Sequence, residues 1–486
     1  MDISGKILII SLGIIFLAIS IYKKIEVLKL LTDFFNEQTY AVNLALFRIA
    51  VFSTLFFVGT KPIFDVVWLS GISKDLLFPP LGYNCISYYF LQVNQSNWLI
   101  IKLFFLLFCI LSAIGLFTNI STKLATIIGF FILAFIQFYG KTYHIHHLFW
   151  FALILSASRC SDVLSIDSLI KNISKSHTDI QNTKVTCSNE YALPLRFAWL
   201  IIGIYYFFAG FWKLWTCGFS WFLTYNVKYH LYQGWSRVDM FQPIFRIDYF
   251  PIIYKASGFY TILFEMLFIF LIVIPRYRLL AIFSGLIFHI FTYFLMGISF
   301  WYLVSCYIAF FNWNALYNSL LTSGKSSYTS NLNAKIKSVI NAKKNFLVCF
   351  IGITAILGNI YCGVLGIDTW PFAVYPRFNF FQPSEKLTTS IEVLDSNNNQ
   401  VYIDESLITN HFDTARWDVL LQRVAKSIDQ NETEILLKSI YRLLVDHCPE
   451  IKRGKRINFF RVKISIDPDL RSKNPISKEL IYILNI

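Results

Sequence analysis

A single lysine interrupts one of the most apolar stretches of the chain, residues 205–215, which read YYFFAGFWKLW. In a helix, the side chain of Lys213 starts out over Ala209 and Gly210, because Cα–Cβ bonds tilt toward the helix N-terminus. These small residues leave room for the ammonium group, or for a substrate, inside a bundle. A desolvated lysine loses its proton more easily and can serve as a base. The alternative is a lysine whose stem lies along apolar surface while its head reaches the membrane interface.

Three histidines, His144, His146 and His147, open a second apolar stretch, YHIHHLFW. They have no partner carboxylate and no i, i+4 pair, so no metal site is predicted. In the topology derived below they lie at the membrane level of Lys213, where His147 would donate a hydrogen bond or carry a proton toward the lysine. The alternative is a set of interfacial histidines bonded only to backbone groups and water.

Three further ionisable side chains lie inside apolar stretches: Arg48 in LALFRIAVF, Glu265 in ILFEMLF and His289 in LIFHIF. Such groups are costly in lipid unless they face the bundle interior or pair with each other. Arg48 and Glu265 are therefore expected to form a structural ion pair. For His289, a structural role and a functional role fit the sequence equally well.

Composition places these residues in a membrane protein. Hydrophobic residues fill 56% of the 486 positions and charged residues only 15%, and the mean hydropathy is +0.54. Many stretches are long enough to cross a hydrocarbon core of about 30 Å. The pattern predicts an all-α polytopic membrane helical bundle of about 9–10 transmembrane helices, with a small C-terminal α+β extramembrane domain. The candidate spans are residues 7–21, 41–60, 98–117, 124–140, 143–158, 193–216, 251–274, 279–296, 299–316 and 346–366.

The net charge of +14 indicates orientation rather than nucleic-acid binding, because the basic residues lie between apolar segments and not along one face. One set of alternate loops carries more than twice as many Lys and Arg residues as the other, and such loops usually face the cytoplasm. This predicts an integral protein of the plasma membrane or inner membrane, in contact with lipids, with its C-terminal domain on the outer face. The nine scattered cysteines have no C-x-x-C spacing and predict neither a zinc site nor a redox motif.

Four regions are expected along the chain. Residues 1–40 form an N-terminal anchor helix and linker, 41–316 the main transmembrane domain, 317–367 a cytoplasmic loop with the last transmembrane helix, and 368–486 a soluble α+β domain. Two lysines directly follow the first apolar stretch and no A-x-A site precedes them. A retained anchor is therefore favoured over a cleaved signal peptide.

The last of these regions has the pattern of a small folded domain. TTSIEVL and QVYI flank DSNNN, which predicts a β-hairpin. Amphipathic helices are expected near 413–427 and 432–447, followed by a last strand, INFFRVKISI. The linker WPFAVYPRFNFFQP is too rich in proline for a helix and too aromatic for open water, so we expect it at the membrane interface.

Five motifs occur in order within residues 41–316: LALFRIAVF, FILAFIQFYGKTYHIHHLFWF, IYYFFAGFWKLW, ILFEMLF with PRYR behind it, and HIFTYFLMGISF. Together they resemble the membrane domain of vitamin K-dependent gamma-carboxylase and of the wider horizontally transferred transmembrane domain (HTTM) family. The resemblance implies a membrane carboxylase, a lyase that works on its outer face with reduced vitamin K or another quinol, O2 and CO2.

In this family, a lysine in an A-G-x-x-K-L stretch deprotonates the quinol. Oxygen then adds, and the resulting alkoxide removes a proton from the γ-carbon of a glutamate, which takes up CO2. The sequence AGFWKL assigns the role of base to Lys213. A histidine in an N-H pair is thought to assist carboxylation, and His147 occupies its place, with His146 where the family has asparagine.

Aromatic side chains around the lysine suit a lipid-soluble cofactor. Tyr206 and Trp212 supply walls and His289 a polar contact, so these three residues are the expected cofactor-binding set. The substrate would be a secreted peptide or protein. The alternative is a non-catalytic membrane protein for maturation, export or immunity toward a secreted peptide. A transporter is disfavoured, because no paired broken helices recur in two matching halves.

Overall fold

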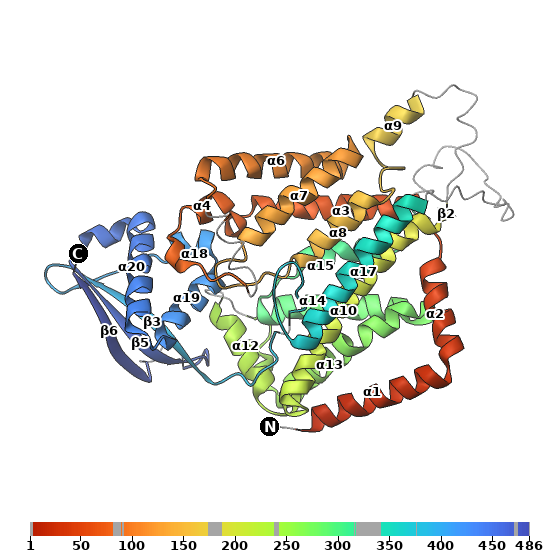
Figure 1. Cartoon of the computed structure of the whole chain (residues 1–486). Helices are drawn as coiled ribbons and strands as arrows, with labels where there is room; N and C mark the ends of the chain where they lie inside the picture. The colour runs from red at the N-terminus through yellow and green to blue at the C-terminus, as the bar shows by residue number, and fades with distance from the viewer. Residues whose placement is uncertain are drawn as a thin grey trace.

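The computed structural model (Figure 1) describes residues 3–80, 89, 92–173, 187–237, 243–314, 316, 342–375, 377–470 and 475–485. Within these residues, eight helices are long and apolar enough to cross a membrane. They are α1 (Ser4–Tyr22), α3 (Ala41–Thr60), α6 (Gln95–Ile114), α7 (Thr118–Phe135), α10 (Asn189–Cys217), α13 (Pro251–Val273), α14 (Arg278–Met296) and α17 (Ala342–Leu365). The mostly helical bundle with a small sheet region confirms the predicted fold class at this level.

Two of the ten expected spans are too short to cross a membrane as helices. Instead of 143–158 the chain forms α8 (His146–Ala157), and instead of 299–316 it forms α15 (Trp301–Val304) and the 3-10 helix η6 (Ser305–Phe310). The 12 residues of α8 extend over about 18 Å, against about 30 Å of hydrocarbon. Hydropathy overestimates both spans because it counts residues in irregular backbone next to the helices, before α8 and after η6.

Helix α10 is the most buried of the eight and packs against α3, α8, α13 and α17. Its closest partner is α13, toward which Gly203 and Gly210 are turned, two helical turns apart. A Cβ on Gly210 would lie 2.9 Å from the Cβ of Glu265. Glycine at this position therefore lets α13 approach the backbone of α10 closely, which places Glu265 beside the last turns of α10.

The N-terminal helix and the C-terminal domain meet at one end of the bundle. The backbone N–H of Phe219, just beyond α10, donates to Ser4 Oγ at the start of α1 (3.2 Å), and Thr216 donates to the carbonyl of Asn379 in the linker. The rest of α1 is almost fully exposed, and α2 (Lys24–Asn36) leads from it to the opposite end (Figure 1). The predicted topology places the N-terminus and the C-terminal domain on the same side of the membrane, and their meeting at one end agrees with it. That this side is the outer face stays a prediction.

Short elements complete the bundle. β1 (Thr39–Tyr40) and β2 (Cys187–Ser188) pair antiparallel. The remaining elements are η1 (Pro62–Phe64), α4 (Val66–Ser70), η2 (Lys74–Leu76), α9 (Ile166–Ile173), α11 (Ser220–Leu223), α12 (Asn226–Arg237), η4 (Ile247–Tyr249) and η5 (Pro275–Tyr277).

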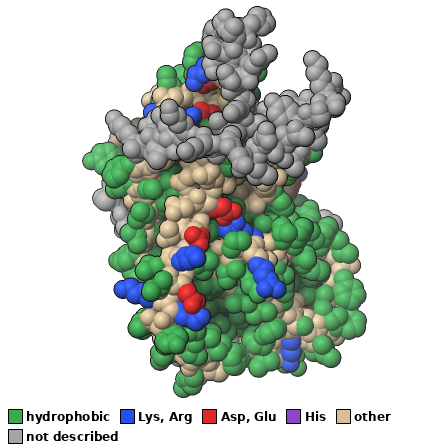
Figure 2. Space-filling view, turned by 90° about the vertical axis from the view of Figure 1, so that its right-hand side faces the viewer, with side chains coloured by type: hydrophobic (Ala, Val, Ile, Leu, Met, Phe, Trp, Pro, Cys, Tyr) green, Lys and Arg blue, Asp and Glu red, His purple; other side chains and the backbone are tan. Residues whose placement is uncertain are grey.

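The surface of the bundle is mostly apolar on the face shown in Figure 2, which lies on the right-hand side of Figure 1: hydrophobic side chains surround a few acidic and basic ones.

The C-terminal domain is a four-stranded sheet in the order β4-β3-β5-β6 with helices on one face. The predicted hairpin, both amphipathic helices and the INFFRVKISI strand are confirmed, but that strand is not the last, and the sequence analysis missed β6 and α18. Asp395 Oδ1 accepts from two turn amides of the hairpin, which explains its turn signal. The elements are β3 (Glu385–Leu394), β4 (Gln400–Val401), α18 (Ser406–Phe412), α19 (Thr414–Lys426), α20 (Gln430–His447), η7 (Pro449–Arg453), β5 (Arg456–Ser465) and β6 (Ser477–Asn485).

The linker between α17 and β3 is non-helical in its described residues, as predicted; its first half packs into the protein, whereas its second half lies partly on the surface. Trp370 and Tyr375 are 2% and 7% exposed. Trp150 Nε1 donates to the carbonyl of Pro371 (3.0 Å), and Trp221 Nε1 to that of Phe378 (2.6 Å). Phe380 and Phe381, in contrast, are 50% and 48% exposed, so only the first half of the linker departs from the predicted interfacial position.

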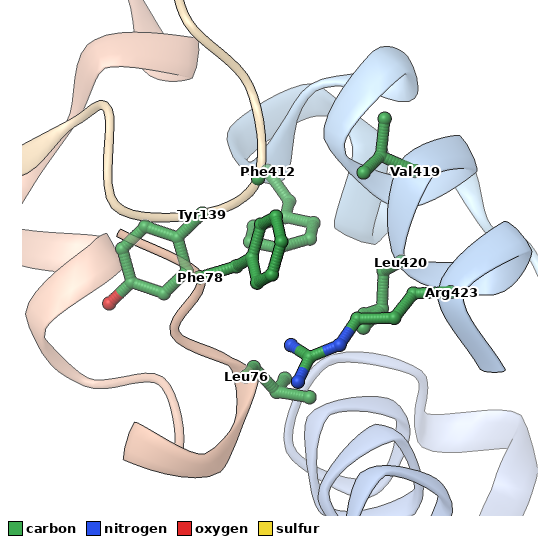
Figure 3. A pocket seen from close by; sticks show the side chains of 8 residues that line it. Leu76, Phe78, Tyr139, Phe412, Val419, Leu420 and Arg423 are labelled. Carbon is green, nitrogen blue, oxygen red and sulfur yellow. The ribbon is translucent and has the colours of Figure 1, made fainter. Parts of the chain in front are cut away.

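A polar and aromatic seam fixes the C-terminal domain to the bundle. Arg416 is fully buried and donates to the carbonyls of Ile63 (2.9 Å) and Ile136 (2.6 Å). Asp413 accepts from Lys141 and Tyr143; burial raises its pKa, but these partners outweigh burial and hold the pKa below the usual value. The seam also encloses an apolar cavity of about 90 Å³, into which the Arg423 guanidinium points (Figure 3).

Candidate functional site

Lys213 forms a buried ion pair with Glu265. It lies in the last turns of α10, and its Nζ donates to Glu265 Oε1 (2.7 Å) and Oε2 (2.6 Å) on α13. The two side chains are only 4% and 6% exposed. The ammonium group therefore lies inside the bundle and does not reach the surface. The sequence allowed either a buried lysine or one whose head reaches the membrane interface, and the structure shows the buried one.

The side chains of Trp221 and His230, together called the roof, cover the ion pair. Lys213 Nζ lies 5.5 Å from the centre of the Trp221 ring, on α11. This ring is fixed by the hydrogen bond from Trp221 Nε1 to the linker carbonyl of Phe378, and it packs near His230 of α12. His230 Nε2 in turn contacts the carbonyl of Phe380 (3.1 Å). The linker thus closes the pair off from the end of the molecule that carries the C-terminal domain.

The expected pair between Arg48 and Glu265 is wrong. The guanidinium of Arg48 donates to the carbonyls of Cys160 (2.7 Å) and Leu164 (2.6 Å), and more weakly to Ala113 (3.3 Å). Backbone carbonyls beyond the ends of α6 and α8 have no helical donors, so a buried arginine with five N–H groups satisfies them. Arg48 is structural, as expected, but it serves a different part of the bundle from Glu265.

A hydroxyl and imidazole cluster lies next to the pair. The Tyr206 hydroxyl, two turns before Lys213, hydrogen-bonds to His289 Nε2 (2.5 Å) on α14 and to the Tyr307 hydroxyl (2.7 Å) on η6. Its ring contacts Phe264 and Phe268, on either side of Glu265. The structure thus brings together two of the expected cofactor-binding residues, Tyr206 and His289. His289 Nδ1 is buried and has no hydrogen-bond partner among the described residues.

His147 belongs to a separate cluster. Its Nε2 donates to the carbonyl of Tyr302 (3.1 Å), and its ring packs against Tyr205 and Phe151. His146 Nδ1 hydrogen-bonds to the hydroxyl of Tyr375 in the linker. No hydrogen bond joins His147 to Lys213 in the described part of the chain. The structure therefore does not bring the two predicted catalytic residues together, and Glu265 is the side chain that bonds to Lys213.

The histidines are more deeply buried than an interfacial set would be. His146 and His147 are 0% and 1% exposed, and the ring of His144 lies 4.4 Å from that of Tyr375. The linker covers these histidines, which the sequence pattern could not indicate, because Tyr375 is more than 200 positions away. Their partners are backbone and tyrosine groups, so this cluster has the contacts of a packed core.

Trp212, the third expected cofactor-binding residue, lies away from the pair. Its Nε1 donates to the carbonyl of Gly363 on α17 (2.7 Å), so it holds α10 to α17. The sequence analysis missed Tyr307 and Trp221. Each is one aromatic residue among many in an apolar segment. The sequence distinguishes it only by its O–H or N–H group, which needs a hydrogen-bond partner when it is buried.

Two cavities have been located in the protein, and both are lined by residues of the C-terminal domain and its neighbours. One is the 90 Å³ cavity at the seam. The other, of about 350 Å³, lies beside β3 and α19. Neither is lined by Lys213, Glu265, Tyr206 or His289. The close approach of α13 to Gly210 and the side-chain exposures of 4% and 6% show that the ion pair is tightly packed in this conformation.

Comparison with protein-family models, curated proteins and solved structures finds no match for this chain. The site is defined by its own geometry: a buried lysine and glutamate between α10 and α13, beside a tyrosine–histidine–tyrosine cluster, inside a bundle of apolar helices. The resemblance to the gamma-carboxylase and HTTM families, which depends on the five sequence motifs, stays a prediction.

Proposed function

We propose that the chain is an integral membrane enzyme of the gamma-carboxylase type, in which Lys213 takes a proton from a quinol and so drives carboxylation of a peptide or protein. The observation that carries the proposal is the burial of Lys213 against Glu265. An ionisable pair at this depth is costly to maintain, and ionisable groups inside membrane helices usually serve transport or chemistry. Its position on the AGFWKL motif is where the family resemblance assigns the base.

Glu265 can accept the proton that Lys213 must lose before it acts as a base. In the ion pair, Lys213 Nζ has no free electron pair. Because both carboxylate oxygens lie within 2.7 Å of Nζ, a proton can move to Glu265 without leaving either group charged and alone. Nζ then accepts the proton of a hydroxyl group, and the restored ammonium group stabilises the new anion while Glu265 stays neutral. Glu265, rather than His147, is the proposed partner of the base.

The cluster beside the pair offers contacts for such a cofactor. His289 Nδ1 is free to bond to a ligand hydroxyl, and Tyr206, Phe264 and Phe268 provide aromatic surfaces. A quinol would supply the ionisable hydroxyl and the electrons that reduce O2, and CO2 the new carboxyl group. Entry requires the side chains of this cluster to move apart, because Tyr206 and His289 are each 6% exposed and their rings are in contact.

The test is oxygen uptake by the purified, detergent-solubilised protein on addition of vitamin K hydroquinone, corrected with a heat-denatured sample. The double variant K213M/E265M removes the base and its partner together, so no unpaired charge is left buried. We expect it to lose at least about 100-fold of the protein-dependent rate. K102M is the matched control, because Lys102 pairs with Asp65 (3.0 Å) away from the site. Absence of uptake by the wild type, or equal uptake by the double variant, would reject the proposal.

The tight packing favours one second candidate, a non-catalytic membrane protein in which Lys213 and Glu265 only hold α10 to α13. The charge-reversed variant K213E/E265K separates the two. A purely structural pair is restored by reversal, so stability and cellular phenotype would both return. A catalytic pair would regain stability, but the amine would then be on α13 and its activity would stay lost.

A further inference from the structure

The sheet of the C-terminal domain has an open edge that faces into a cleft. β4 pairs only with Val393 and Leu394, the last two residues of β3. The preceding residues, 385–392, pair with β5 on one side and with no described strand on the other. An unpaired strand edge presents a row of free N–H and C=O groups, which is a template for another strand.

The register shows which groups face this edge. The N–H of Ile466 donates to the carbonyl of Ser384 (3.0 Å), so even-numbered residues of β3 turn their backbone groups toward β5. Odd-numbered residues point the other way, in agreement with the pairing of Val393 with Val401 of β4. The N–H and C=O groups of Leu387, Thr389 and Ile391 therefore point into the open side.

The cleft of about 350 Å³ follows this edge. Residues 388–391, which include side chains of both sheet faces, line it together with Trp417 and Leu421 of α19. Val462 and Ile464 of β5 also line it, and the Lys386–Asp418 ion pair, which joins β3 to α19, bounds the cleft at the start of the open edge. Ser236 of α12 forms part of the lining on the side of the bundle. The cleft therefore runs beside the open edge, between the sheet domain and the helix whose His230 belongs to the roof over the Lys213–Glu265 pair.

We propose that this cleft binds an extended peptide segment of a partner protein, which adds to the sheet as a strand beside β3. Beyond the Lys386–Asp418 ion pair, residues 387–391 of β3 offer an edge about 17 Å long, enough for a segment of about five residues. Trp417 and Leu421 contribute apolar surface on the face covered by α19, so alternate residues of the peptide would be apolar there. Thr388 and Ser390 on the other face suit small or polar residues.

The shape of the cleft argues against a second copy of this chain as occupant. The β3 edge lies between α19 and α12, so two such edges cannot approach each other in the way that exposed edge strands do. A single extended segment can enter the cleft and satisfy the backbone groups of Leu387, Thr389 and Ile391. The inference names the substrate class for the proposed function and depends on that function only for what happens to the bound peptide.

The probe is a synthetic octapeptide of alternating valine and threonine with a lysine added at each end, titrated against the full-length protein by fluorescence anisotropy. Leu387→Pro removes an N–H that faces the cleft while leaving the β5 ladder intact. We expect at least tenfold weaker binding. The control is Ile483→Pro, which removes an outward N–H from β6, the opposite edge of the same sheet, and should leave binding within twofold of wild type.

Two further measurements do not depend on how well Leu387→Pro folds. A version of the peptide methylated on every backbone nitrogen should not bind, and hydrogen exchange in segment 385–392 should slow when the unmodified peptide is added. Failure of the unmodified peptide to bind, retained binding by the methylated one, or equal weakening by Ile483→Pro would overturn the proposal. Protection of the amides of Leu387, Thr389 and Ile391 in the protein alone would do the same, since another part of the chain would then occupy the edge. Because the readout is binding, it is independent of whether Lys213 acts as a base.

Discussion

Replacing one member of the Lys213–Glu265 pair should destabilise the bundle far more than replacing both. Side-chain exposures of 4% and 6% mean that K213M leaves a carboxylate, and E265M an ammonium group, beyond the reach of solvent. Breaking a buried pair in this way costs about 3–5 kcal/mol, whereas replacing both partners by apolar residues is often close to neutral. We therefore expect a loss of about 3–5 kcal/mol in each single variant and about 1 kcal/mol or less in K213M/E265M.

Thermal unfolding of the purified protein in detergent, followed by tryptophan fluorescence, measures these differences. With an unfolding entropy of about 2.1 cal/mol/K per residue over 486 residues, 1 kcal/mol corresponds to about 1 °C. The single variants should then melt about 3–5 °C below wild type and the double variant within about 1 °C of it. K102M, which breaks a pair whose side chains are 19% and 23% exposed, should shift the midpoint by about 1 °C or less.

Whether Lys213 and Glu265 stabilise the bundle as a pair is decided by comparing these melting midpoints with one another, and not by any single midpoint. If K213M, E265M and the double variant lose the same stability, the two side chains do not depend on each other and the buried pair has been misread. If K102M loses as much as K213M, burial is not what makes the inner pair important. A stable double variant, by contrast, supplies the folded protein without a base that the oxygen-uptake assay needs.

Two further results are expected. Gly210→Ala should cost about 1–3 kcal/mol of stability in the same melts, because the new Cβ would lie 2.9 Å from the Cβ of Glu265. The control Gly13→Ala, on exposed α1 with nothing within 4 Å, should be neutral or stabilising. Equal effects of the two variants would contradict the close approach of α13 to α10 at Gly210. The pKa of Asp413 is lowered in the folded protein, so its contribution to docking the C-terminal domain is present above the unfolded value of about 3.9 and is lost as pH falls through the folded value. Limited proteolysis should therefore cut Asp413→Asn faster than wild type at pH 7, and this difference should shrink as the pH falls below about 3.9; a constant difference would contradict the sign.

Hydropathy predicted the helices that run long and straight, and it failed where the backbone is irregular. Between α7 and α8, for example, the hydrogen bond from the Tyr143 N–H to Gln137 Oε1 (2.6 Å) holds the backbone in a turn. A sliding window cannot detect a side chain that replaces the helical acceptor. β6 was missed for a related reason: it is an edge strand with little burial, so its pattern is weak.

The partners of buried charges depend on which helices are neighbours, and a sequence without homologues does not give that order. Arg48, Lys213 and Glu265 could each be identified as buried ionisable residues, and either base could have paired with the acid. The glycine on α10 that admits α13 decides between them, because Gly210 faces Glu265 directly. A glycine one turn before a lysine in an apolar helix is the signal that could have indicated the right pair.

The closure of the site differs between its end and its sides, and this difference bears on what could reach the pair. Toward the C-terminal domain, hydrogen bonds from Trp221, Asn226 and His230 to linker carbonyls hold the roof in place. On the sides, α13 and α14 expose apolar residues such as Leu263 and Phe283, and the hydrogen bond from the Tyr260 hydroxyl to the carbonyl of Ser284 (2.8 Å) joins the two helices. A lipid-soluble ligand that enters between α13 and α14 would therefore meet apolar surface and this hydrogen bond, whereas a water-soluble one would meet the three hydrogen bonds of the roof. Under the proposed function, the sides are the route by which a quinol would reach Lys213.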